Sequence, residues 1–207
     1  MKIGLIIFDF DGVLADSFDS FFSLTKEGLL NIGLKLTPTQ YRNFFIGNVH
    51  QGIKDFIKDE NKYLLFSKFR GDNYEKYYHP SLFPGSIELI KKFNRKYYLA
   101  IASSGIRGNI VKLLKNKQID NKFKIILATN EYTKGRMINK ILSKLKFKPG
   151  ETTMITDTVG DIKIAKKIGL KTIAATWGFH DYNTLLSAKP NLIVKSFREL
   201  ERLMLTD

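Results

Sequence analysis

The chain has 207 residues, of which 43% are hydrophobic, so it can bury a core as one main domain with a small insertion. It carries a formal net charge of +14 and no cysteine, which excludes disulfides, thiol catalysis and cysteine-ligated metal sites. No apolar run reaches the ~18 residues of a membrane-spanning helix, and Met1–Phe8 is too short for a signal peptide, so we expect a cytoplasmic protein without membrane contact.

The apolar run Ile3–Phe8 is rich in isoleucine and stops at an acidic residue, as expected of a strand buried on both faces of a parallel sheet. Similar runs recur later in the chain, at Tyr97–Ala102, Ile125–Ala128, Thr153–Thr156, Lys171–Ala174 and Leu192–Val194. Segments with helical apolar spacing lie between them, within residues 87–93, 110–114, 138–145 and 162–168, and Gly169 stands where a C-terminal cap is expected. This alternation predicts an α/β fold with a doubly wound, parallel, Rossmann-like sheet.

A helical segment interrupts the alternation after the first strand. Its apolar stripe starts at Phe18 and ends at Gly33, and Thr37 and Pro38 mark the start of another helix. The helical pattern then continues without a convincing strand until Pro80 marks the return to the sheet. We therefore expect a small helical cap domain, residues 16–80, inserted into a core domain formed by residues 1–15 and 81–207.

Polar side chains follow several of the predicted strands at the edge where such sheets bind ligands. Asp9 and Asp11 follow the first strand, Ser103 and Ser104 follow the second, and Lys134 begins a later helix. Asp157 follows the strand at 153–156, with Asp161 four residues on. Carboxylates suit Mg²⁺, and a carboxylate can also attack phosphorus to form an aspartyl-phosphate. A lysine and a hydroxyl can hold phosphoryl oxygens while their charge redistributes.

The segment from Asp9 to Ser17 resembles the first motif of the haloacid dehalogenase-like (HAD) hydrolase superfamily. Tyr97–Ser103 looks like the second motif, Lys134 like the third, and Asp157–Asp161 like the fourth. Trp177-Gly178-Phe179 and the strand after Pro190 resemble the phosphoglycolate-phosphatase-like branch, which has a helical cap after motif one. The four motifs occur in order and cover nearly the whole chain.

The resemblance implies a Mg²⁺-dependent phosphatase that acts on a small phosphate monoester. By this resemblance, Asp9 is the nucleophile and a metal ligand, and Asp11 is the acid/base, with its backbone carbonyl on the metal. Ser103, with Ser104 beside it, and Lys134 hold the phosphoryl oxygens. Asp157 ligates the metal and Asp161 supports that shell.

Several of these residues also have ordinary structural interpretations. Ser103 could be a turn or helix N-cap serine, Lys134 an exposed lysine, and Asp161 a helix N-cap. Thr156 stands where the family usually has glycine, and Ser104 replaces an asparagine common in the phosphatase branch. Both departures weaken any inference about the substrate.

The alternative functions are a sugar phosphomutase of the β-phosphoglucomutase type and a nucleotide or nucleic-acid-end phosphatase. The positive charge would favour anionic partners, but the lysines form no concentrated basic stripe, which disfavours nucleic acid. We place substrate specificity in the cap, because the core groups address only the phosphoryl centre. The cap residues that could contact the rest of the substrate are Arg42, His50, Lys54 and Arg70.

Overall fold

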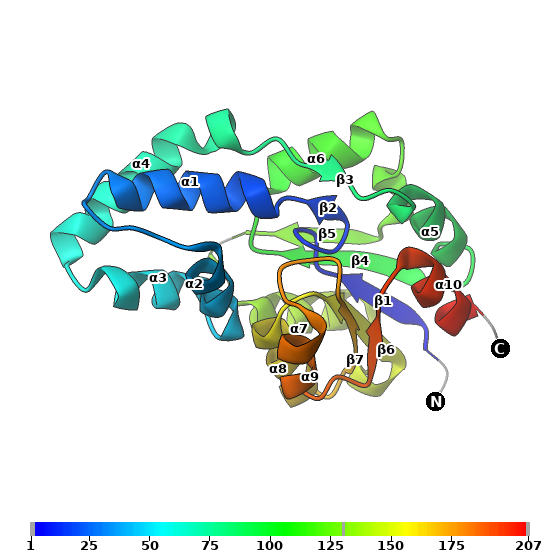
Figure 1. Cartoon of the computed structure of the whole chain (residues 1–207). Helices are drawn as coiled ribbons and strands as arrows, with labels where there is room; N and C mark the ends of the chain where they lie inside the picture. Colours follow the sequence, from blue (N-terminus) through cyan, green and yellow to red (C-terminus); the bar gives the residue numbers. More distant parts are fainter. Residues whose placement is uncertain (1–2, 130, 206–207) are drawn as a thin grey trace. The chain divides into compact units, whose positions relative to one another are not determined.

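The structure, a computed structural model, describes residues 3–129 and 131–205 (Figure 1). The chain divides into two compact units. The first unit comprises Met1–Ala15 and Leu82–Asp207, and the second comprises Asp16–Ser81.

The first unit is built on a six-stranded parallel sheet with the strand order β5-β4-β1-β6-β7-β8. The strands are β1 (Leu5–Phe8), β4 (Tyr98–Ser103), β5 (Ile125–Ala128), β6 (Thr152–Thr156), β7 (Lys171–Ala175) and β8 (Leu192–Val194). The predicted α/β class and parallel sheet are therefore confirmed. The continuous apolar runs have their expected cause, because β1 and β6 are buried at every residue.

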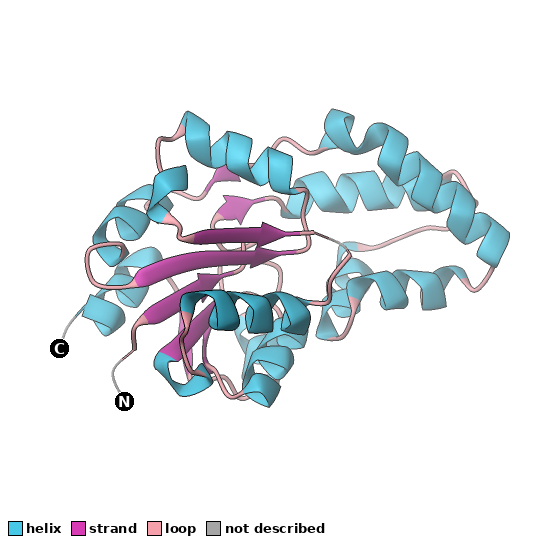
Figure 2. Ribbon diagram, turned by 180° about the vertical axis from the view of Figure 1, so that it is seen from behind, coloured by secondary structure: helices cyan, strands magenta, loops and turns pink. Residues whose placement is uncertain are grey.

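Helices cover both faces of the sheet (Figure 2). One face carries α5 (Ser86–Phe93), α6 (Arg107–Asn116) and α10 (Phe197–Leu205), and the other carries α7 (Lys134–Leu145) and α8 (Val159–Ile168), which ends at the expected cap, Gly169. Successive residues of β1 alternate between the two layers, as the two-residue period of a strand requires. Ile6 and Phe8 pack in the first layer, and Leu5 and Ile7 in the second.

The central strand β1 determines where the candidate site lies. Phe8 pairs with Ile101 of β4 on one side and with Ile155 of β6 on the other. The chain builds outward from β1 through β4 to β5 and then crosses to β6, so the strand order reverses beside β1. Ligands of open α/β sheets bind at the carboxyl ends of the strands at such a point.

Three shorter elements complete the first unit: α9 (Tyr182–Ser187), packed on α8 and β8, and the 3₁₀ turns η2 (Asp120–Lys122) and η3 (Pro149–Glu151). Within the described ranges, 3–129 and 131–205, no helix combines the length and apolar character needed to cross a membrane.

The second unit is helical. It contains α1 (Phe18–Leu30), α2 (Pro38–Asn43), the 3₁₀ turn η1 (Phe44–Ile46), α3 (Val49–Ile57) and α4 (Glu60–Tyr77). Thr37 begins α2 with a capping box to Gln40, which satisfies backbone N–H groups of the first turn. Helices α1 and α4 pack together through aromatic rings, such as Phe21 and Tyr74 with centroids 6.3 Å apart.

Two very short strands lie where the chain passes between the units. β2 (Ala15–Asp16) pairs with β3 (Ser81–Leu82) in a two-stranded sheet. The sequence did not predict these strands, because two residues are too few to show a period of two.

Candidate active site

Asp9 lies directly after β1, and its carboxylate is held by the local backbone. Its N–H donates to the Ile155 carbonyl at 2.9 Å, which extends the pairing of β1 with β6 by one residue. The Phe10 N–H donates to Asp9 Oδ1 at 2.8 Å. Asp9 is only 8% exposed, so this acid is not a solvated turn residue.

Lys134 is the first residue of α7, and its ammonium group reaches the carboxylate of Asp9. Its Nζ lies 2.8 Å from Asp9 Oδ1 and 2.9 Å from Asp161 Oδ2, and it donates to the Ala102 carbonyl at 2.9 Å. Thr133 caps α7 by accepting the Arg136 N–H, which fixes where the helix begins. Lys134 is buried, so its interpretation as an ordinary exposed lysine is wrong.

Burial and neighbouring charges shift the pKa values of Asp9 and Lys134. Desolvation raises the pKa of Asp9 well above its usual value, the charge of Lys134 lowers it, and the nearby Asp161 raises it again. Desolvation lowers the pKa of Lys134, but the charges of Asp161 and Asp9 outweigh it and raise that pKa overall. The ammonium group is therefore charged at neutral pH and offsets an acidic cluster.

Asp157 follows β6 and is fully buried. Its Oδ2 accepts the Phe179 N–H at 2.7 Å, whereas its Oδ1 accepts no hydrogen bond from the described part of the chain. Desolvation raises the pKa of Asp157 to about 7, although the hydrogen bond from Phe179 opposes this shift. A buried carboxylate oxygen without a donor costs free energy unless another group meets it.

Asp161 lies in the first turn of α8, and the N-cap of that helix is Thr158. The interpretation of Asp161 as a helix N-cap is therefore wrong, and its carboxylate instead pairs with Lys134. Thr156, which stands in place of the usual glycine, is fully buried with its Oγ1 3.5 Å from Asp161 Oδ2. The threonine is accommodated by placing its hydroxyl toward this carboxylate.

Asp11 and Ser103 approach each other across the ends of β1 and β4. Ser103 Oγ lies 3.5 Å from Asp11 Oδ2 and accepts the Gly105 N–H at 3.0 Å. This second contact is a turn interaction, so Ser103 has the structural role of a turn serine, while α6 begins after Ile106. Ser103 is buried beside Asp11, whereas Ser104 is exposed.

The donors at this edge fit a divalent cation. Asp9 and Asp157 are buried acids whose pKa values are raised chiefly by desolvation, and Asp157 Oδ1 has no donor among the described residues. Within residues 3–129 and 131–205, no three acidic or histidine side chains are grouped so as to hold a metal ion by themselves. Mg²⁺ commonly takes one or two protein carboxylates and completes its shell with water and substrate phosphate, so this donor set fits it.

The family assignment follows from comparison with known proteins. Residues 6–175 match the model of the haloacid dehalogenase-like hydrolases. The chain belongs to this family. The resemblance predicted from the motifs is therefore confirmed, and the protein is a HAD hydrolase.

Relatives and solved structures agree with this assignment. The chain is 29% identical to a phosphoglycolate phosphatase of Synechococcus elongatus over 58% of its own length and 57% of that protein. It is 26% identical to pyrophosphatase PpaX of Anoxybacillus flavithermus over 97% of its length and 96% of the relative. A HAD-family hydrolase from Streptococcus pneumoniae has the same fold, with a TM-score of 0.84 at 23% identity and 96% coverage of both chains.

The four cap residues selected from the sequence of this HAD hydrolase have different surroundings. The Arg42 guanidinium lies 3.7 Å from the Phe18 ring centroid, and Lys54 pairs with Glu60 at 2.9 Å. Arg70 is half-buried, and its Nε is buried without a hydrogen-bond partner among the described residues. Desolvation and the charge of Arg70 lower the pKa of His50. The Lys54 ammonium is thus paired with Glu60, whereas the Arg70 Nε–H has no hydrogen-bond acceptor among the described residues.

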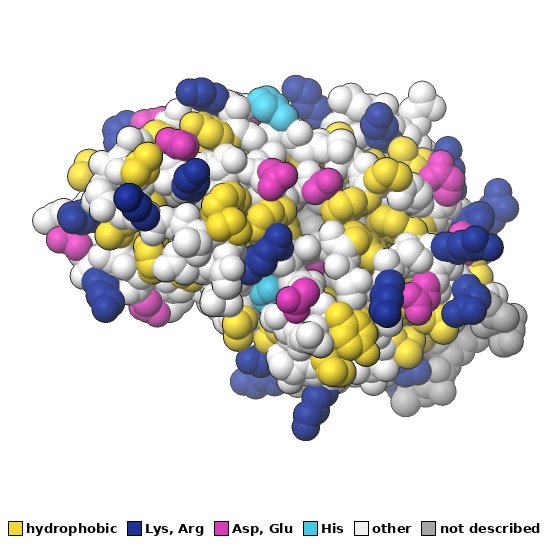
Figure 3. All heavy atoms as spheres, viewed as in Figure 1, with side chains coloured by type: hydrophobic (Ala, Val, Ile, Leu, Met, Phe, Trp, Pro, Cys, Tyr) yellow, Lys and Arg dark blue, Asp and Glu magenta, His cyan; other side chains and the backbone are white. Residues whose placement is uncertain are grey.

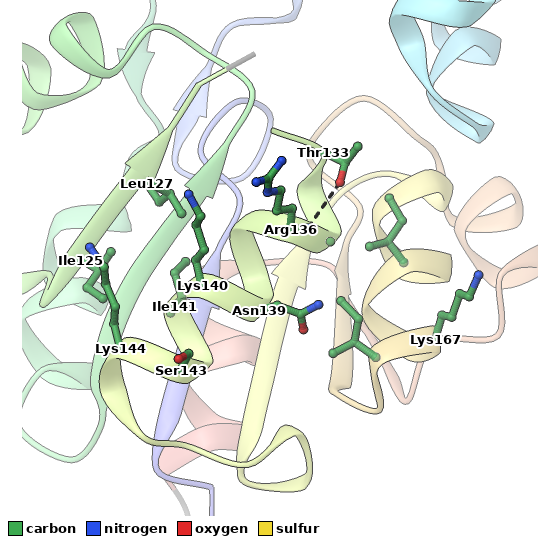
Figure 4. Close-up of a pocket in the computed structure, with 13 residues that line it drawn as sticks. Ile125, Leu127, Thr133, Arg136, Asn139, Lys140, Ile141, Ser143, Lys144 and Lys167 are labelled. Atoms are coloured by element: carbon green, nitrogen blue, oxygen red, sulfur yellow. Dashed lines mark hydrogen bonds between the residues drawn. The ribbon is translucent and has the colours of Figure 1, made fainter. Parts of the chain in front are cut away.

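A hollow of about 730 Å³ lies along α7 (Figure 4). It is lined by apolar residues of β5, α7 and α8 and by basic residues that include Lys140 and Lys144. None of the expected catalytic, phosphate-binding or metal residues lines it. Lys140 and Lys144 of α7 thus line this hollow, whereas Lys134 contacts Asp9.

The large positive charge is not concentrated on the face shown in Figure 3. The lysines and arginines of the described residues are spread over that face among other side chains, with several close together at its right-hand edge. A nucleic-acid surface would be expected to gather them along one face or helix.

The structural role of residues Trp177–His180 was not predictable from the sequence. His180 is buried, and its Nδ1 accepts the Val159 N–H at 3.1 Å. Trp177 Nε1 donates to the Val13 carbonyl at 3.1 Å. The motif Trp-Gly-Phe resembles a family feature, but nothing in it indicates contacts with Asp157 or with the loop after Asp9.

Proposed function

We propose that this HAD hydrolase is a Mg²⁺-dependent phosphatase that hydrolyses a small phosphate monoester through an aspartyl-phosphate on Asp9. The observation that carries the proposal is the buried Asp9 carboxylate at the end of β1, paired with Lys134 at 2.8 Å. Relatives named phosphoglycolate phosphatase and pyrophosphatase support a small phosphate compound as the substrate.

In the first step, Asp9 attacks phosphorus and the bond to the leaving alcohol oxygen breaks. Because Lys134 and the Phe10 N–H both engage Oδ1, Oδ2 is the oxygen left for the attack. Asp11 donates a proton to the leaving oxygen, so the alcohol departs neutral. Ser103 and Lys134 hold the phosphoryl oxygens, with Ser104 at the rim, while charge redistributes.

In the second step, the Asp11 carboxylate takes a proton from water, whose oxygen attacks the phosphorus of the aspartyl-phosphate. The bond from phosphorus to Asp9 breaks, and inorganic phosphate leaves with Asp9 regenerated. Asp11 lies beside Ser103 and Gly105, which places it next to the proposed phosphate site.

We assign the cation to Asp9, Asp157 and the Asp11 backbone carbonyl, with Asp161 supporting them through Lys134. When bound, Mg²⁺ supplies positive charge that offsets the phosphoryl oxygens. The helical unit is proposed as the cap, with Arg42, His50, Lys54 and Arg70 as residues that contact the rest of the substrate. A cytoplasmic location also stays a prediction.

A panel of phosphate monoesters, assayed with Mg²⁺ for released inorganic phosphate, tests the proposal. We expect stoichiometric phosphate release from at least one small ester. Conversion of a sugar phosphate to its isomer with little phosphate release would instead identify a mutase. Absence of turnover of every ester would contradict the proposal.

Removal of divalent cations is expected to abolish hydrolysis. Excess EDTA should reduce phosphate release to background, and Mg²⁺ should restore it better than Ca²⁺, whose longer bonds and higher coordination number would displace Asp9. Phosphate release in EDTA at the untreated rate would show that no such cation takes part.

Asp11→Asn is expected to slow steady-state hydrolysis by about 10²–10⁴-fold, the usual contribution of a general acid–base group. The amide cannot take a proton from the hydrolytic water, so an activated ester should leave the phosphorylated enzyme behind. Intact-protein mass spectrometry after brief exposure to the ester measures this species. An unchanged hydrolysis rate would assign the base to another residue.

A further inference from the structure

The segment Trp177–His180 contacts Asp157 through two of its backbone N–H groups. The Phe179 N–H donates to Asp157 Oδ2 at 2.7 Å, and the His180 N–H donates to the Asp157 carbonyl at 3.3 Å. The side chain and the main chain of Asp157 are therefore both held by two consecutive residues. The Asp157 carboxylate has one oxygen occupied by this segment and the other, Oδ1, without a donor in the described chain.

Glycine at positions 12 and 178 allows this close approach. A Cβ on Gly178 would overlap Asp157 Oδ2 and the Gly12 carbonyl oxygen. Gly12 has φ +77°, and a Cβ there would overlap the same Oδ2. Backbone atoms of the two loops are thus packed directly on the Asp157 carboxylate, where any larger residue would displace it.

His180 connects the same segment to the start of α8. Because its Nδ1 accepts the Val159 N–H, the ring proton of the neutral imidazole resides on Nε2. This N–H belongs to the first turn of α8, where it has no partner within the helix. The buried ring therefore fixes the turn between Asp157 and α8.

Trp177 ties the segment to the loop that follows Asp9. Its Nε1 donates to the Val13 carbonyl, and its ring packs on Phe197 with centroids 4.5 Å apart. The segment is thus anchored on both sides of the acids, at Val13 and at Val159.

We propose that Trp177–His180 is a positioning segment, which occupies Oδ2 of Asp157 and presents Oδ1 to the cation. The inference rests on the proposed function only in taking Asp157 as a ligand. These residues do not touch the substrate or the cation themselves. They act by fixing the orientation of one carboxylate, and such supporting contacts commonly change metal affinity by about 10–100-fold.

Direct titration with Mn²⁺, with free ion followed by electron paramagnetic resonance, tests the inference without an activity assay. Gly178→Ala and His180→Leu should each raise the Mn²⁺ dissociation constant by about 10–100-fold. His180→Asn should restore affinity to within about threefold, because its Oδ1 can replace Nδ1 as the acceptor for Val159. Gly71→Ala, in open space on α4, is the control and should bind as wild type does.

Circular dichroism accompanies each titration to identify variants that do not fold. If Gly178→Ala is unfolded, the two His180 variants decide the question. Wild-type affinity in both Gly178→Ala and His180→Leu would overturn the positioning role, and so would equal losses in His180→Leu and His180→Asn. A wild-type enzyme that releases phosphate yet binds no Mn²⁺ would instead contradict the metal assignment in the proposed function.

Discussion

Asp9→Asn should lower kcat by about 10⁴-fold or more, as expected when the group that forms the covalent intermediate is lost. The amide keeps the shape of the carboxylate and can still accept the Phe10 N–H, but it is a poor nucleophile. Phosphate release from the best ester of the panel gives the rate. Retention of more than a tenth of the wild-type rate would exclude Asp9 as the nucleophile.

The fold of this variant should persist, which separates catalysis from stability. Lys134 keeps its pair with Asp161 at 2.9 Å and its bond to the Ala102 carbonyl. Burial disfavours the charged form of Asp9, as its raised pKa indicates. Loss of this charge therefore removes a desolvation cost, which offsets the loss of one ion-pair partner of Lys134. We expect a Tm within about 4 °C of wild type, which corresponds to roughly 1 kcal/mol. Asp72→Asn, an exposed acid on α4, is the matched control.

Lys134→Met should be the most damaging substitution for both activity and stability. It leaves Asp9 and Asp161 close together without their shared cation, and removal of one partner of a buried pair typically costs about 3–5 kcal/mol. Thermal unfolding should show a Tm lower by about 10 °C. The rate should fall by about 10²–10³-fold from the loss of one donor to the phosphoryl oxygens.

Two further variants test whether the loss arises from the unpaired acids. The double substitution Asp9→Asn with Lys134→Met should recover part of the Tm but none of the activity, because one repelling charge is gone. Lys144→Met, on the exposed face of the same helix, should leave both measurements close to wild type. A Tm of Lys134→Met equal to that of the wild type would show that the ion pairs of Lys134 contribute nothing to stability.

The sequence predicted the sheet well because its strands are buried on both faces. Such strands appear as short apolar runs, and the limits of β5 and β8 are those expected. The acids could also be selected from the sequence, because a carboxylate directly after a buried strand has no simple packing role. The assigned roles of these residues stay predictions.

Other features depend on contacts that no local pattern encodes. Lys134 has the same local sequence character as an exposed lysine, and only the placement of α7 against β4 buries it. Leu64 and Leu65 continue an apolar helical pattern, yet they are 59% and 62% exposed. The role of His180 depends on its hydrogen bonds with Val159 and Asp157. These residues are distant from His180 in sequence and become its neighbours only when β7 pairs with β6.

The central position of β1 has a consequence for synthesis on the ribosome. Leu5–Phe8 needs partners on both edges, but Phe8 meets Ile155 only after β6 has been made. At about 5–20 residues per second, roughly 7–30 s separate the two strands. During that interval an apolar strand has an unsatisfied edge, while the helical unit, with its local α1–α4 packing, can already form. The nascent chain should therefore carry a folded helical insertion ahead of an unfinished sheet, and should be most prone to aggregation until Thr152–Thr156 emerges.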